Sequence, residues 1–143
     1  MSRHRWTLAA AAALLAALLV TAPANAARKA TPKETAALTR AIFSSPVAGI
    51  DTVAHKKYRV TGTKISTVSR SWATATITPR KRYAPTLQGG YAIAVQPAGT
   101  RTWVVVDFGS SMVGCGIAPT SVVADLLGVK PAADACPDGE GVS

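Results

Sequence analysis

Residues 72–78 read Trp-Ala-Thr-Ala-Thr-Ile-Thr, and this short stretch decides the predicted fold. Ala73, Ala75 and Ile77 point to one side of an extended chain, whereas Trp72 and the three threonines point to the other. A period of two is typical of a β-strand that turns one face toward an apolar core. A sheet built around this strand is therefore expected.

Three other segments show the pattern of strands: residues 58–68, 91–95 and 103–108. Gly62 interrupts the first of them at a position where a β-bulge is expected. Turn-forming residues separate consecutive strands, which predicts an antiparallel meander. Residues 103–106, Trp-Val-Val-Val, are apolar on both faces, so the last segment is expected to be a central strand.

A helix is predicted before the strands. Thr31 and Glu34 have the spacing of a capping box, in which each residue satisfies a backbone N–H of the first turn. Leu38 and Ile42 then lie on one face, and Pro46 marks the limit of the helix because a residue before proline avoids helical angles. The four residues before Thr31 are expected to be a flexible start.

A second, short helix is predicted after Pro119, with Gly128 placed to end it. The expected fold is therefore α+β. An N-terminal helix packs on a curved four-stranded antiparallel sheet, and a short C-terminal helix follows.

The first 26 residues have the pattern of a cleaved signal peptide. Arg3 and Arg5 precede an apolar run of 13 residues, and Ala24 and Ala26 form a small-residue cleavage site. The run is shorter than the roughly 20 residues of a membrane-spanning helix, although an uncleaved N-terminal anchor is the competing interpretation. We expect one secreted domain at residues 27–143, ordered over 31–137, with an extracellular or cell-wall location and no transmembrane segment.

Cys115 and Cys136 are the only cysteines in the chain. Outside the cytoplasm two thiols in one small domain usually oxidise together, so a disulfide is expected. A catalytic or metal-binding thiol is the alternative. Such a thiol needs partner side chains, and only one histidine follows residue 26.

Two stretches carry a family resemblance: residues 69–75, SRSWATA, and residues 102–107, TWVVVD, followed by Cys115 and by Cys136-Pro137. Together they resemble a group of small exported bacterial proteins of uncharacterised function, over most of residues 31–137. The order of one helix and a meander is similar to cystatin-like and nuclear-transport-factor-2-like domains. The resemblance implies that fold but no catalytic residue, and the Gln-x-Val-x-Gly loop of inhibitory cystatins is missing.

Reactive side chains are scarce after residue 26. His55 could in principle act with a serine and with Asp51 or Asp107, but the Gly-x-Ser-x-Gly motif does not occur. Residues 108–114 are glycine-rich yet lack the Gly-Lys-[Ser/Thr] ending of a phosphate-binding loop. We therefore expect no enzyme, no cofactor and no metal site.

Positive charge is the strongest functional signal. The chain has 16 Lys and Arg against 7 Asp and Glu, and two clusters lie near opposite ends of the first predicted hairpin. These six candidate residues are Lys56, Lys57, Arg59, Arg80, Lys81 and Arg82. Because a hairpin brings its two ends together, we expect a basic edge that binds anionic envelope polymer or another extracellular protein, and no nucleic acid. Solubility explains the same charges, and this interpretation stays open.

Trp72, Trp103 and Asp107 are candidates for a pocket between helix and sheet. Such a pocket would make the chain a ligand-carrying or inhibitory module. The competing interpretation places both tryptophans in the core and lets Asp107 bind nearby backbone or an arginine.

Overall fold

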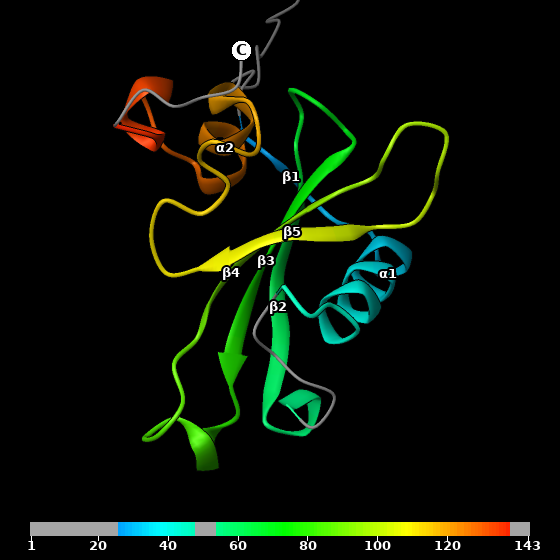
Figure 1. Ribbon diagram of the computed structural model, residues 1–143, viewed down its shortest axis with the longest axis vertical. Helices are drawn as coiled ribbons and strands as arrows, with labels where there is room; N and C mark the ends of the chain where they lie inside the picture. Colours follow the sequence, from blue (N-terminus) through cyan, green and yellow to red (C-terminus); the bar gives the residue numbers. More distant parts are fainter. Residues whose placement is uncertain (1–25, 48–53, 138–143) are drawn as a thin grey trace, which may run out of the picture.

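The computed structural model, which describes residues 26–47 and 54–137, is an α+β fold of one five-stranded antiparallel sheet and two α-helices (Figure 1). The strands follow one another across the sheet in chain order, as in a meander. The strands are β1 Arg28–Lys29, β2 Tyr58–Ile65, β3 Trp72–Pro79, β4 Gly90–Val95 and β5 Val104–Gly109. The helices are α1 Pro32–Phe43 and α2 Thr120–Leu127, with 3₁₀ turns η1 Ala54–Lys56, η2 Lys81–Tyr83 and η3 Ala132–Ala135. Within the described residues, no helix has the length and apolar character needed to cross a membrane.

The fifth strand corrects the prediction of four. Residues 28 and 29, expected to be a flexible start, pair with the end of β2, Arg28 opposite Ile65 and Lys29 opposite Lys64. The Ala30 N–H extends this pairing by donating to the Thr63 carbonyl at 3.0 Å. Two residues are too few to show the alternation by which a strand is predicted from sequence. Residues 28 and 29 are a strand because their backbone pairs with β2.

The position of β5 is a second correction. The strand is at the edge of the sheet and not at its centre, because the last strand of a meander has only one neighbour. It is apolar on both faces for another reason. Val105 packs in the cluster beneath α1, and Val106 packs against the cluster beneath α2, while Val104 remains 45% exposed.

Local signals placed both helices correctly. The capping box of Thr31 and Glu34 is present at the start of α1, which ends at Phe43, before Pro46. Helix α2 ends at Gly128, whose φ of 72° lies in the left-handed region that glycine adopts without steric cost. Gly62, with φ 57°, lies where the register of β2 against β3 shifts, so the predicted bulge is also confirmed.

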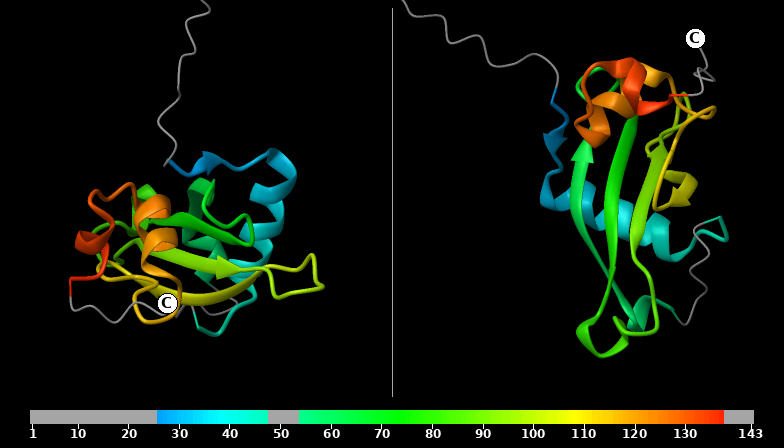
Figure 2. Two further views of the ribbon diagram at one scale, coloured as in Figure 1. Left: turned by 90° about the horizontal axis from the view of Figure 1, so that it is seen from above. Right: turned by 90° about the vertical axis from the view of Figure 1, so that its left-hand side faces the viewer.

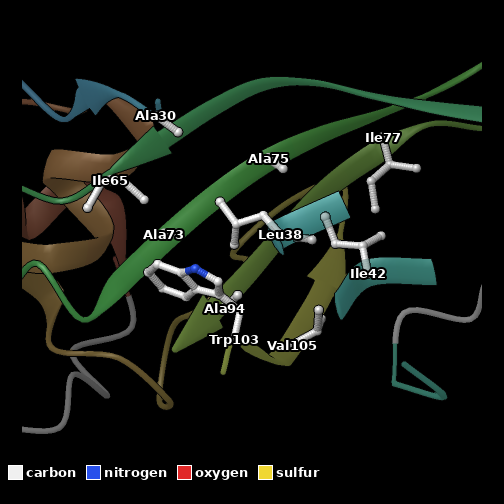
Figure 3. Packing of buried hydrophobic residues seen from close by; sticks show 11 residues of the cluster. Ala30, Leu38, Ile42, Ile65, Ala73, Ala75, Ile77, Ala94, Trp103 and Val105 are labelled. Atoms are coloured by element: carbon white, nitrogen blue, oxygen red, sulfur yellow. The ribbon is translucent and has the colours of Figure 1, made fainter. Parts of the chain in front are cut away.

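One face of the sheet packs against α1. Leu38 and Ile42 are each 1% exposed and lie among small and branched side chains of the strands, with Trp103 beside them (Figure 3). Ala73 and Ala75 of β3 are buried in the same cluster. This buried apolar cluster is the larger of the two cores.

The opposite face of the sheet is covered only at one end, where α2 and η3 lie (Figures 1 and 2). There Ile93 packs against Val122, Val123 and Leu126 of α2. Strands β2, β3 and β4 continue beyond α2 and form a narrow extension of the sheet (Figure 2). We call the uncovered part the open face, and its outward side chains are Arg59, Thr61, Thr76, Thr78 and Tyr91.

Candidate functional site

The two basic clusters meet at the end of the sheet farthest from α2. Tyr58 pairs with Pro79 in the strand register, and the Arg80 N–H donates to the Lys57 carbonyl at 2.7 Å. The chain enters β2 through η1 and leaves β3 into η2 at this end (Figure 1). We call the surface formed by Lys56, Lys57, Arg59, Arg80, Lys81 and Arg82 the basic tip.

A tyrosine organises part of the basic tip. The Tyr83 ring has the Arg82 guanidinium carbon 4.7 Å from its centroid and the Lys57 Nζ at 6.0 Å. Both distances are in the range of cation–π attraction, which partly offsets the repulsion between the two cations. Lys57 is half-buried and the other five basic residues are exposed, so the charges remain available to a partner.

Carboxylates of the described residues do not neutralise this surface. The single ion pair in residues 26–47 and 54–137 joins Arg28 to Glu34, with an N–O distance of 2.6 Å. This pairing with Arg28, together with hydrogen bonds from Thr31, lowers the pKa of Glu34 to about 2. Glu34 therefore holds β1 against the start of α1. Because no carboxylate of the described residues pairs with the basic tip, the tip keeps its positive charge.

Asp107 is used by the backbone around it. One carboxylate oxygen accepts from the Phe108 N–H at 2.8 Å, and the other accepts from the Gly114 N–H at 2.6 Å. These bonds hold the segment after β5 in place next to Cys115, which forms a disulfide with Cys136, their Cα atoms 5.6 Å apart. The predicted disulfide is confirmed.

The structure separates the two candidate tryptophans. Trp103 is buried in the cluster beneath α1, whereas Trp72 packs against the cluster beneath α2, on the other face of the sheet. Between α1 and the sheet, the described side chains pack against one another as apolar core (Figure 3). Trp72, Trp103 and Asp107 thus do not line one common pocket.

The candidate catalytic residues are not brought together among the described residues. His55 is exposed, and its ring lies 5.9 Å from that of Phe43, edge to face. Asp51 lies outside the described residues, and no hydrogen bond of the described part joins His55 to a carboxylate. In the same part of the chain, no three His, Cys, Asp or Glu side chains gather as a metal site would require.

Sequence reasoning missed the role of Asp125, a buried carboxylate in α2. It accepts from the Ser66 hydroxyl and from the Thr67 N–H, both at 2.7 Å, and more weakly from the Val68 N–H at 3.4 Å. Burial disfavours the charged form, but the hydrogen bonds outweigh burial and hold the pKa of Asp125 below its usual range. Asp125 therefore ties α2 to the β2–β3 turn.

Sequence reasoning also missed a trough on the open face. Two adjoining pockets, of about 360 and about 290 Å³, share Thr76, Tyr91 and Ser110 in their linings. The larger is bounded by α2 at Leu126 and Leu127, and the smaller extends along β3 to Thr78. The threonines that alternate along residues 72–78 are the signal in the sequence that could have indicated it.

Comparison with protein-family models, with curated proteins and with solved structures finds no match to this chain.

Proposed function

We propose that this protein is an exported, non-enzymatic protein that binds anionic polymer of the cell envelope through the basic tip. The observation that carries the proposal is the convergence of two clusters, 56–59 and 80–82, on one end of the β2–β3 pair. Like charges held close together repel one another, and a polyanion that binds them relieves this repulsion and releases its own counterions. Phosphate or carboxylate groups repeated along a polymer match such a surface.

Two features support the export part of the proposal. Residues 1–26 have the pattern of a signal peptide, and the Cys115–Cys136 disulfide is of the kind that persists in oxidising compartments outside the cytoplasm. The small secreted proteins that residues 69–75 and 102–107 resemble point the same way. A location at the envelope would place the basic tip next to acidic polymers.

The non-enzymatic part rests on how three of the carboxylates are used. Asp107 and Asp125 accept hydrogen bonds that hold backbone segments, and Glu34 pairs with Arg28. General acid–base catalysis needs an ionisable group that can reach a substrate, and structural hydrogen bonds occupy these three carboxylates.

The test compares two triple variants that remove the same charge. Arg80→Ala/Lys81→Ala/Arg82→Ala removes half of the basic tip, whereas Lys33→Ala/Arg40→Ala/Arg101→Ala removes three exposed cations elsewhere. Retention on immobilised poly(glycerol phosphate) and polygalacturonate is measured in a salt gradient, with anionic lipid vesicles as a third probe. For a polymer charged as densely as single-stranded nucleic acid, three lost contacts lower the slope of log affinity against log salt by about 2.

We expect the tip variant to elute earlier from at least one polymer and the control variant to behave like the wild type. Equal losses in both variants would mean that only net charge matters and would overturn the proposal. The proposal would also be overturned if the wild type were retained on neither polymer, or if it bound only the vesicles. Unchanged melting temperatures establish that both variants are folded.

A further inference from the structure

The trough on the open face lies next to the basic tip. In the strand register, Thr78, which lines the trough, is opposite Arg59 of the tip. At its other end the trough is lined by Lys64, which is exposed. Five positions separate the two cations along β2, roughly 16 Å at the rise of a strand. The trough therefore connects the basic tip to a further cation beyond it.

The lining of the trough combines hydroxyl groups with one accessible aromatic ring. Tyr91 is 43% exposed, and Met112, which also lines the trough, is 47% exposed. Within the described part of the chain, Thr74 uses its hydroxyl to donate to the Ala92 carbonyl at 3.0 Å, but no hydrogen bond engages the hydroxyls of Thr76 and Thr78. The trough thus offers free hydroxyl groups beside an aromatic face.

Gly62 leaves space in the trough because it has no side chain. A Cβ atom at Gly62 would lie 3.0 Å from the Thr76 Oγ1, closer than ordinary contact, and it would cover that hydroxyl. The bulge of β2 therefore leaves Thr76 accessible from the trough. A β-strand with a side chain at this position would partly fill the space.

We propose that the trough binds the sugar rings of an anionic polysaccharide whose charged groups reach the basic tip. This inference rests on the proposed function and names its ligand class. A sugar ring has apolar C–H faces and a rim of hydroxyls, so one face packs on the Tyr91 ring while the rim bonds to the threonines. A purely apolar ligand would bury the threonine hydroxyls without partners, which costs free energy. A polyanion without sugar rings would gain nothing from Tyr91.

The experiment compares two polyanions of equal charge number, a galacturonate oligomer and a linear polyphosphate, by isothermal titration at low salt. Tyr91→Ala is expected to weaken galacturonate binding about 2- to 10-fold, the range for loss of an aromatic packing partner, with no change for polyphosphate. Tyr91→Phe keeps the ring and is expected to restore galacturonate binding. The Arg80→Ala/Lys81→Ala/Arg82→Ala variant is expected to weaken both ligands.

The outcomes separate this inference from the proposed function. If the tip variant weakens both ligands but Tyr91→Ala weakens neither, or weakens both equally, the sugar trough is wrong and the basic tip stands. If the wild type binds neither ligand, both proposals fail.

Amide chemical shifts of the wild type supply a readout that needs no variant. Galacturonate should shift the signals of Thr76, Tyr91 and Ser110, and shifts confined to the basic tip would overturn the trough.

Discussion

Removing the Asp125 carboxylate should destabilise the fold more than any other single acidic change in the described part of the chain. Asp125 is 5% exposed and Ser66, its partner in the β2–β3 turn, is fully buried. The two short hydrogen bonds, from the Ser66 hydroxyl and from the Thr67 N–H, each measure 2.7 Å. Asp125→Ala deletes both and leaves these donors without their acceptor.

The expected loss follows from these two bonds. A hydrogen bond to a charged group contributes about 1.5–3 kcal/mol, so loss of the two bonds in Asp125→Ala should lower the free energy of unfolding by about 3–6 kcal/mol. Asp125→Asn keeps one acceptor oxygen but turns an N–H₂ group toward the other donors. It should lower the free energy of unfolding by about 2 kcal/mol. Asp134→Ala, an exposed position in η3, is the matched control and should stay within about 0.5 kcal/mol of the wild type.

The pH dependence has a defined sign. Because the pKa of Asp125 is lower in the folded protein than its ordinary 3.8, the carboxylate contributes stability above that ordinary value. This contribution is lost as the pH falls through the folded-state pKa. Urea unfolding followed by tryptophan fluorescence at pH 7 and at about pH 2 should show that Asp125→Asn loses less stability on acidification than the wild type. Equal stability of Asp125→Ala and Asp134→Ala at pH 7 would refute the reasoning.

Two further predictions concern the ends of the described chain. Replacing both Cys115 and Cys136 by serine opens a loop with a sequence separation of 21 and should cost about 3 kcal/mol in urea unfolding; a loss below about 1 kcal/mol would contradict a stabilising crosslink. Glu34→Gln removes the pairing that lowers the pKa of Glu34 to about 2, so it should be less stable than the wild type above pH 4.5, and the difference should vanish toward pH 2. Since Arg28 and Glu34 are partly exposed, with side-chain exposures of 41% and 29%, we expect Glu34→Gln to lose less than about 1 kcal/mol of stability. Thermal unfolding at low salt measures this difference.

Local signals explain why much of the fold was predictable. The capping box at Thr31, the bulge at Gly62 and the left-handed end of α2 at Gly128 depend on bonds or backbone angles within a few residues. Four strands with their chain order follow from alternation and turns. With only two cysteines available, the disulfide partner needed no further information.

The missing parts all depend on contacts between distant segments. The two-residue β1 forms because β2 offers it a backbone edge, and the edge position of β5 follows from the order of the whole sheet. Asp125 becomes a turn anchor only where α2 meets residues 66–68, more than 50 positions earlier in the chain.

By itself the sequence determined both helices and four of the five strands, their order, the pairing of Cys115 with Cys136 and the closeness of the two basic clusters at the ends of one hairpin. The tertiary structure decided which face of the sheet each helix covers, and therefore that Trp72 and Trp103 lie apart while Thr76 and Tyr91 share an open trough. Periodicity assigns a side chain to one face or the other of a strand, but it does not say what packs there. That is decided when the whole chain buries its apolar surface at the lowest free energy.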